Sequence, residues 1–317
     1  MKPENFARLV VSGAVAAVLA AAPALAQDYP ARPVEMVVPW GPGGGADQLA
    51  RLVGKLLEPE LGVGVPVVNV PGGTGATGMA KLMSSPADGH SMAIYIADAH
   101  ALLAGSNPRW TMEDITPVAV MIQAPSFIFV AKDSPYKTWA DFEAAAKAKP
   151  ETLKVATLGF GSVDDFSLKA IGAKGATVVQ VPFAKPAERY VSILGGHADA
   201  LYEQAGDVGQ FLSSDQMRPL LVFGEERFEA FPDVPSSKEA GYDVALPQFR
   251  AIVVRSGTPQ AALDKLSAAL TKVAENPEFV EFLKVQHGRA DSFIVGPDAV
   301  AFVEQQLDDM KQVAGTQ

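Results

Sequence analysis

Residues 34–47, Val-Glu-Met-Val-Val-Pro-Trp-Gly-Pro-Gly-Gly-Gly-Ala-Asp, decide the fold. The apolar, β-branched residues 34–39 predict a strand. After the glycines, leucine and valine recur at helical spacing between positions 49 and 57, which predicts a helix. Asp47 falls in the first turn of that helix, where the helix dipole favours a carboxylate. The glycine run therefore joins the end of a strand to the start of a helix.

The same pattern returns at once. Residues 65–70 read as a strand, 71–78 as a glycine-rich turn and 79–84 as a short helix, so two such loops should face one rim. We see no internal repeat. Further strands are predicted at 91–96, 118–121, 127–131, 153–157, 177–181, 198–202, 219–223 and 251–254. The firmest helices are predicted at 138–148, 259–273 and 297–310. This alternation predicts an α/β fold of sheets covered by helices.

The N-terminus has the features of a secretory signal peptide. Lys2 and Arg8 precede an Ala-rich apolar run at 9–22, which ends in the small-x-small pattern at 24–26. That run is shorter than the roughly 20 residues that span a membrane. We predict removal of residues 1–26 and a mature protein in the periplasm.

Charge and composition exclude several functions. The chain has 26 Lys and Arg against 36 Asp and Glu, and removal of residues 1–26 takes two basic and one acidic residue, which leaves a formal charge of −11. Such a chain repels nucleic acid and anionic lipid surfaces. It has no Cys, so disulfides and thiol chemistry are absent. An anionic ligand must be held by local geometry against this overall charge.

The glycine loops admit several interpretations. Residues 73–78 satisfy G-x-G-x-x-G, with Asp98 about 20 residues further on, but a lone motif in an exported chain is weak support for dinucleotide binding. A P-loop fails because Met79, not Lys, follows Gly78. Tight turns alone remain an alternative. We favour anion binding, because glycine at a helix start lets backbone N–H groups approach a carboxylate.

A third loop at 158–165 contains Ser162 as a helix N-cap, and it lacks the G-x-S-x-G of a nucleophile elbow. His90, His100, His197 and His287 have no metal-ligand spacing and are expected at the surface or as caps. The acidic pairs 164–165 and 308–309 cannot work as catalytic carboxylate pairs, because adjacent helical residues point to different faces, and they are expected to be solvated. We predict no catalytic residues, metal or cofactor, which disfavours a secreted enzyme. Trp110 and Trp139 are expected to pack in the core.

Taken in order, the loops resemble one family. The matching segments are Tyr29-Pro30-x-Arg32-Pro33, residues 37–47, 69–75, 87–90, 159–162, 181–183, 194–199, 231–235 and 257–259. Together they are similar to the receptors of tripartite tricarboxylate transporters, also called the Bug family, over essentially the whole mature chain.

That resemblance implies a periplasmic binding protein fold of type II, with two α/β lobes that close on an organic acid. Lobe 1 is expected at 27–130 plus 250–317 and lobe 2 at 131–249, with crossing strands near 127–132 and 249–254. The resemblance also implies a monomer that captures a di- or tricarboxylate or an aromatic carboxylate and delivers it to membrane permease subunits. In this family the carboxylate is held by backbone N–H groups, hydroxyls and water rather than by a salt bridge.

The residues expected to contact the ligand come from the glycine loops and from polar side chains at the same rim. They are Trp40, Gly43, Gly44, Ala46, Asp47, Gly73, Thr74, Gly75, Thr77, Asp98, Gly161, Ser162, Val163, Asp164, Phe183, Tyr202 and Glu203. The chain departs from its relatives at Phe183-Ala184-Lys185-Pro186 and at Asp164-Asp165. An Asp in the cleft would repel a second carboxylate, unless it faces solvent or recognises a hydroxyl or ammonium group. Trp40 favours a flat ligand. A ligand-presenting partner of a two-component sensor remains an alternative function.

Overall fold

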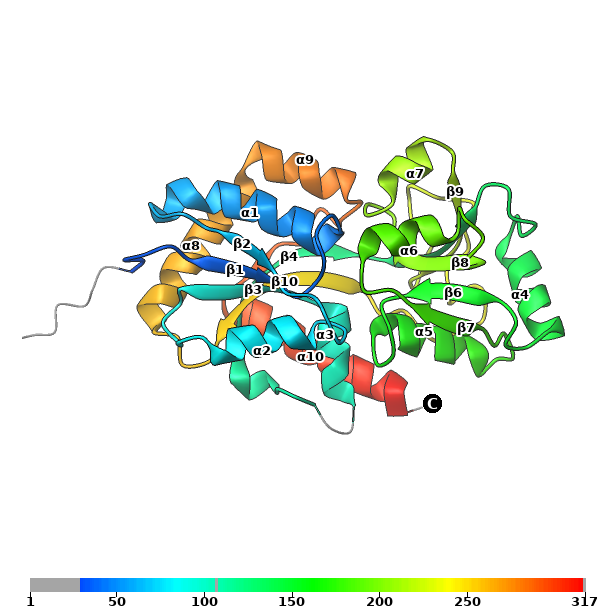
Figure 1. The fold of residues 1–317 in the computed structure, drawn as a ribbon, viewed down its shortest axis with the longest axis horizontal. Coiled ribbons are helices and arrows are strands. Elements are labelled where there is room, and N and C mark those ends of the chain that lie inside the picture. The colour runs from blue at the N-terminus through cyan, green and yellow to red at the C-terminus, as the bar shows by residue number, and fades with distance from the viewer. Residues whose placement is uncertain (1–28, 106–107, 316–317) are drawn as a thin grey trace, which may run out of the picture.

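The computed structural model describes residues 29–105 and 108–315. The predicted signal peptide lies outside these residues. The described chain folds around two β-sheets, each covered by helices and set side by side along the long axis (Figure 1). We call the six-stranded sheet with its helices lobe 1, and the five-stranded sheet with its helices lobe 2.

The sheet of lobe 1 has the strand order β11-β4-β10-β3-β1-β2. β1 is parallel to β2 and β3, whereas β10 is antiparallel to both of its neighbours. All six residues of β3 are buried, because helices cover both faces of the sheet. The strands are β1 (Glu35–Val38), β2 (Val67–Asn69), β3 (Ser91–Ile96), β4 (Ile115–Ala124), β10 (Gln248–Arg255) and β11 (Ile294–Val295).

The sheet of lobe 2 has the order β7-β6-β8-β5-β9. β6 is parallel to β7 and β8, and β5 is antiparallel to β8 and β9. The strands are β5 (Ser126–Ala131), β6 (Lys154–Thr157), β7 (Val179–Pro182), β8 (Ala200–Gln204) and β9 (Met217–Phe223). The chain changes sheet at Pro125 and again between β9 and β10.

Helices flank both sheets. In Figure 1, α1 and α9 lie along one side of lobe 1, and α2, α3 and α10 lie along the other. The helices of lobe 1 are α1 (Gly45–Leu61), α2 (Ala76–Ser84), α3 (Ala97–Ala101), α8 (Gln260–Glu275), α9 (Pro277–Val285) and α10 (Pro297–Gly315). Those of lobe 2 are α4 (Trp139–Ala148), α5 (Val163–Gly172), α6 (Pro186–Ser192) and α7 (Gly209–Ser213). Within residues 29–105 and 108–315, no helix is long and apolar enough to cross a membrane.

The predicted α/β class is confirmed, and each predicted strand overlaps an observed one. Several short elements were not predicted, among them α3, α6, α7, α9 and β11. β11 has only two residues, and α9 follows α8 directly, separated by Asn276, so the two resemble one longer helix in the sequence. The predicted lobe boundaries stay a proposal. Strand pairing places all of β5 in the sheet of lobe 2, although the prediction began lobe 2 at residue 131.

Candidate ligand-binding cleft between the lobes

The N-terminus of α1 points into the cleft without a side-chain cap. Its N-cap is Gly44, which has an extended backbone and no side chain that could cap the helix. The first N–H groups of any α-helix lack intrahelical acceptors. Gly44, Gly45 and Ala46 line a cavity between the lobes, so these donors are available to an anion there.

The carboxylate of Asp47 supports this loop from inside lobe 1. It accepts a hydrogen bond from the Gly43 N–H (2.9 Å), two from Arg51 (3.0 and 2.9 Å) and one from Asn69 on β2 (2.9 Å). Although burial favours the neutral acid, these hydrogen bonds lower the pKa of Asp47. Gly43 was expected to bind the ligand, but its N–H donates to Asp47 instead.

Lobe 2 repeats this arrangement. The Asp165 carboxylate accepts hydrogen bonds from the Gly161 N–H (2.8 Å), from Lys169 (2.9 Å) and from Gln180 on β7. Again a glycine lies four residues before the acid, a cation lies four residues after it, and an amide comes from the neighbouring parallel strand. The sequence shows no repeat, because the residues that surround the two acids differ in type. The expectation that Asp165 is solvated was wrong.

Asp98 and Asp164 meet where the lobes touch. Asp98 accepts hydrogen bonds from the Val163 N–H of lobe 2 (3.1 Å) and from Gln248 (2.8 Å), and Asp164 accepts one from the Leu158 N–H (2.8 Å). Burial raises the pKa of both carboxyls, and the charge of Asp98 raises that of Asp164 further. The expectation that Asp164 is solvated was wrong: it lies at the end of a helix enclosed by the other lobe.

Two buried ion pairs lie nearby. Arg189 of α6 pairs with Glu203 of β8, and both side chains are less than 5% exposed. Burial raises the pKa of Glu203 to about 7, even with the opposing effect of Arg189. Arg250 of β10 crosses the cleft to Asp207 (2.6 Å). The family resemblance implied that the ligand carboxylate is held without a salt bridge, and the structure places two guanidinium groups in this cleft.

Several buried polar atoms in this region have no hydrogen-bond partner among the described residues. They are Trp40 Nε1, Arg189 Nε and Nη1, the Tyr190 hydroxyl and Asp207 Oδ1. All four side chains line the same cavity. Buried polar groups in native proteins are almost always paired with protein or water, so an unpaired set indicates a missing partner.

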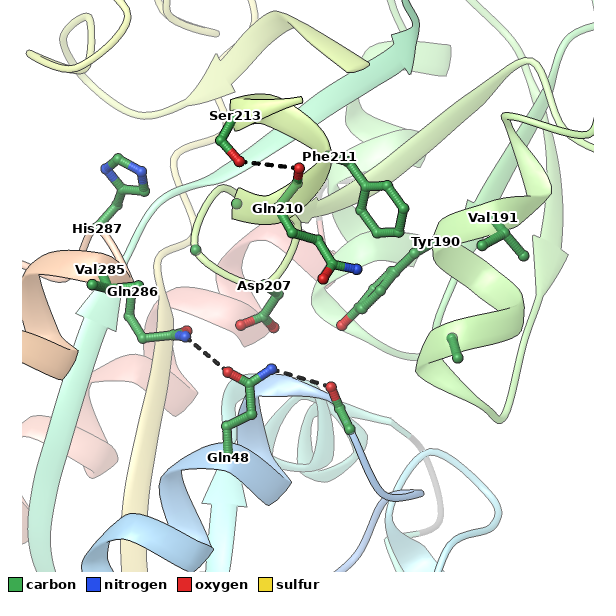
Figure 2. Close-up of a pocket in the computed structure, with 14 residues that line it drawn as sticks. Gln48, Tyr190, Val191, Asp207, Gln210, Phe211, Ser213, Val285, Gln286 and His287 are labelled. Atoms are coloured by element: carbon green, nitrogen blue, oxygen red, sulfur yellow. Dashed lines mark hydrogen bonds between the residues drawn. The ribbon is translucent and has the colours of Figure 1, made fainter. Parts of the chain in front are cut away.

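Three cavities adjoin one another along the cleft. The outer cavity, about 400 Å³, lies between residues 72–75 of lobe 1 and residues 158–160 and 182–184 of lobe 2. The deep cavity, about 30 Å³, shares Trp40 and Leu158 with it. The wide cavity, about 680 Å³, opens between α1, α6, α7 and the end of α9, and shares Tyr190 and Asp207 with the deep one (Figure 2).

The cleft brings many of the predicted site residues together. The deep cavity is lined by Trp40, Gly44, Ala46, Asp98 and Glu203. The outer cavity is lined by Trp40, Gly73, Thr74, Gly75 and Phe183, and the wide cavity by Gly43. Outside the three linings lie Asp47, Thr77, Gly161, Ser162, Val163, Asp164 and Tyr202. Ser162 caps α5, and the Tyr202 hydroxyl bonds to Ser167 (3.1 Å).

Sequence reasoning missed the arginines and their neighbours. Arg189, Tyr190, Gln204, Asp207 and Arg250 all line the deep cavity. They come from three separate parts of the chain, and no local motif unites them. One signal was present: Arg250 lies within the otherwise apolar run 249–254, where an unpaired charge would be costly.

Other expectations have mixed outcomes. Trp110 and Trp139 are buried, which confirms their packing role. His100 is fully buried, and its ring bonds to the Val303 carbonyl (2.9 Å) and the Tyr95 hydroxyl (3.0 Å), so its expected surface or capping role was wrong. Burial lowers the pKa of His100 to about 4, which keeps the ring neutral.

Comparison with known proteins agrees with this architecture. Residues 49–313 match the model of the family described as the tripartite tricarboxylate transporter family receptor. The chain belongs to this receptor family. Its members are binding receptors rather than enzymes. A UPF0065 protein of Bordetella bronchiseptica is 30% identical over 86% of this chain and 82% of its own length. Protein BugT of Bordetella pertussis is 29% identical over 88% and 86%.

Solved structures share the periplasmic binding protein fold with this receptor. A TctC solute-binding protein from Polaromonas, without ligand, is 29% identical with a TM-score of 0.66, covering 91% of this chain and all of its own. MatC from Rhodopseudomonas palustris with bound malate is 23% identical, with a TM-score of 0.80 and coverage of 90% and 99%. Another R. palustris protein, with adipate, is 23% identical, with a TM-score of 0.81 and coverage of 91% and 98%.

Proposed function

We propose that this receptor captures a small organic carboxylate in the periplasm and delivers it to the permease of a tripartite tricarboxylate transporter. One observation carries the proposal. Unpaired donors from Trp40 and Arg189 line the same cavity as the uncapped start of α1. A carboxylate supplies the acceptors that these donors lack, and it suits the positive end of the helix dipole.

The ligand group at this site should be small and acidic. The two structural neighbours described above hold malate and adipate, which are both carboxylates. Arg189 is already paired with Glu203 through Nη2, so the ligand would use its other nitrogens, Nε and Nη1. The Arg189 guanidinium group can therefore bind the Glu203 carboxylate and the ligand carboxylate at the same time.

The closed cleft favours capture by closure of the lobes. The Val163 N–H bonds to Asp98, and Arg250 pairs with Asp207, so each contact joins the two lobes. The deep cavity between these contacts has room for about one or two water molecules. We infer that a ligand enters while the lobes are apart and is enclosed by lobe surfaces that are largely pre-formed.

Binding to purified residues 27–317 tests the proposal. The protein is unfolded and refolded to strip any bound ligand, then titrated calorimetrically with malate, adipate and a series of monocarboxylates. We expect at least one acid to bind and to raise the melting temperature, because a ligand stabilises the state that it binds. Failure of every acid to bind would contradict the proposal.

A pair of variants tests the site itself. Arg189→Gln is made in a Glu203→Gln background, so that no buried carboxylate is left unpaired. Because hydrogen bonds to a charged group contribute about 1.5–3 kcal/mol, affinity should fall about tenfold or more relative to Glu203→Gln alone. Arg227→Gln is the matched control, since Arg227 forms an exposed ion pair with Glu239 elsewhere on lobe 2. If Glu203→Gln, the Arg189→Gln/Glu203→Gln double variant and Arg227→Gln all bind the ligand equally well, Arg189 does not bind the ligand carboxylate.

A further inference from the structure

We propose that Asp98 and Asp164 share a proton between the closed lobes, so that closure around a ligand takes up this proton from solution. We call these two residues the interlobe acid pair. The inference rests on the proposed function and concerns how capture at the same cleft is regulated. It is carried by the place of the pair in the fold, by its hydrogen bonds and by the groups that surround it.

The interlobe acid pair lies inside the contact between the lobes. Asp98 belongs to α3 of lobe 1 and Asp164 to α5 of lobe 2, and each is 1% exposed. The N–H of Val163, the residue before Asp164, donates to Asp98 (3.1 Å), so the two helices are joined at this point. Separation of the lobes therefore parts the two carboxyls and lets water reach them.

The hydrogen bonds of the pair require a proton. Asp98 accepts from the Val163 N–H through Oδ1 and from Gln248 through Oδ2 (2.8 Å). Asp164 accepts from the Leu158 N–H through Oδ2 (2.8 Å), which leaves Oδ1 for the proton. The two carboxyl groups also share a hydrogen bond with each other. Because an ionised carboxylate only accepts hydrogen bonds, one member of the pair must be protonated in the closed lobes.

The surrounding groups favour retention of that proton. Burial raises the pKa of both acids, and the charge of Asp98 raises that of Asp164 further. Arg189 of α6 has the opposite effect on both, but it is paired with Glu203 of β8, whose charge again raises the pKa of Asp164. Tyr202 of β8 is a neutral hydroxyl, because burial raises its pKa well above the ordinary value.

The other ionisable groups of this junction are paired or neutral. Arg250 of β10 pairs with Asp207 (2.6 Å), and Asp165 of α5 pairs with Lys169 (2.9 Å). His100 of α3 is neutral, because burial lowers its pKa to about 4. The buried side chains of α10, which packs against both α3 and α5, include no ionisable group among the described residues. No unpaired cation therefore replaces the shared proton.

Closure should be linked to proton uptake. With the lobes apart, water stabilises both carboxylates, so both are ionised at neutral pH, as ordinary Asp side chains are. With the lobes closed, the pair holds one proton more. The closed state is therefore favoured at lower pH, and its advantage is lost as pH rises, so ligand affinity should fall as pH rises above about 5.

Calorimetry at several pH values tests this linkage. Refolded wild-type protein is titrated with malate, adipate and the same monocarboxylates between pH 6.5 and pH 8.5, in buffers of different ionisation enthalpy that report the protons taken up. Carboxylic acids are already ionised in this range, so the proton goes to the protein. We expect uptake of about one proton per ligand and an affinity that falls by up to about tenfold per pH unit.

The outcomes separate this inference from the proposed function. Binding of an acid without proton uptake, and with an affinity that does not change with pH, would overturn the inference and leave the proposed function intact. Failure of every acid to bind would contradict both.

Asp164→Asn assigns the proton to the pair. The new amide can donate to Asp98 at any pH, and its oxygen can still accept from the Leu158 N–H, so the uptake should fall by about one proton and the affinity should lose most of its pH dependence. Glu203→Gln is the matched comparison, because Glu203 is a buried acid of the deep cavity that pairs within lobe 2. That variant should keep the uptake. Uptake that persists in Asp164→Asn and disappears in Glu203→Gln would overturn the inference.

Asp98→Asn provides the same test from lobe 1, should Asp164→Asn fail to fold. Its amide can donate to Asp164, and the Gln248 side chain can turn its own amide to accept a hydrogen bond instead of donating one. This variant should also bind ligand without the proton uptake of the wild type. Unchanged uptake in Asp98→Asn would show that the proton lies elsewhere and would overturn the inference.

Discussion

Arg189 and Glu203 form an ion pair that is almost fully enclosed between the lobes. Removing two charges from water is costly, and their mutual attraction offsets that cost only in part. The pair therefore stabilises the fold weakly. Its main consequence is that Arg189 stays charged and oriented inside the cleft, where the ligand carboxylate would need it.

A double-mutant comparison measures this coupling. Arg189→Met leaves the buried Glu203 without its counter-ion, so the free energy of unfolding should fall by about 3 kcal/mol or more. Adding Glu203→Gln removes the unpaired acid and should restore much of that loss. Urea denaturation of the wild type, both single variants and the double variant gives the coupling energy. Additive effects of the two substitutions would contradict a direct interaction.

The raised pKa of Glu203 also predicts a pH effect. Burial raises that pKa to about 7 in the folded state, against 4.5 for the ordinary group. Between these values the folded protein binds more protons than the unfolded chain, so the stability from this group is lost as pH rises towards and through 7. From pH 5 to pH 8, Glu203→Gln should lose less unfolding free energy than the wild type. Glu188→Gln, which changes an exposed acid of α6, should behave as the wild type.

At the scale of elements, the loop-to-helix junctions at α1 and α5 are built differently. α1 starts at Gly44 without a cap, whereas α5 is capped by Ser162, whose Oγ accepts from the Asp165 N–H (3.2 Å) and donates to the Gly159 carbonyl (2.6 Å). The uncapped helix leaves its donors for a ligand. The capped helix fixes the next residue, Val163, for its hydrogen bond to the other lobe.

Removal of the α5 cap tests this distinction. Ser162→Ala should lower the free energy of unfolding by about 1 to 2 kcal/mol, the usual cost of losing a cap. It should also weaken ligand binding, because the loop before Val163 loses its anchor. Thr138→Ala removes the cap of α4, away from the cleft, and should cost similar stability without changing affinity. Equal affinities in the two variants would show that the cap of α5 serves stability alone.

At the scale of the whole molecule, closure depends on close contact between backbones of opposite lobes. A Cβ added at Gly206 of lobe 2 would overlap the backbone of Gln286 in lobe 1, and one added at Gly44 would meet Pro186 at 2.7 Å. These glycines therefore let the lobes approach. The three atoms nearest to each added Cβ all belong to the opposite lobe.

Gly206→Ala should hold the lobes apart while leaving each lobe folded. We expect a larger radius of gyration in small-angle X-ray scattering and weaker ligand binding, because the closed state is now opposed by a steric clash. Gly64→Ala, in lobe 1 between α1 and β2, is the matched control, since the one atom that a Cβ there would meet within 4 Å is the Glu58 Oε1 at 3.9 Å. Scattering by Gly206→Ala that matches the control would show that closure tolerates the added methyl.

The fold class and the loops follow from local sequence patterns. Alternating strands and helices predicted the α/β architecture, and the glycine runs at 41–45 and 72–75 do join strand ends to helix starts. Such features depend on residues close together in the chain, so spacing and residue type reveal them. The predicted contacts of individual loop residues with a ligand stay predictions.

The charges of the cleft were decided by tertiary structure. In sequence, Asp164 and Asp165 are ordinary helix acids, and Arg189, Asp207 and Arg250 are unrelated positions. Folding buries all five side chains, and it brings Arg189, Asp207 and Arg250 to one cavity, so tertiary contacts determine their partners; burial also raises the pKa of Asp164. The sequence alone determined an α/β receptor with glycine loops suited to an anion. Only the tertiary structure set two arginines and the free oxygen of Asp207 around one cavity, because distant segments acquire a shared environment only when the chain folds.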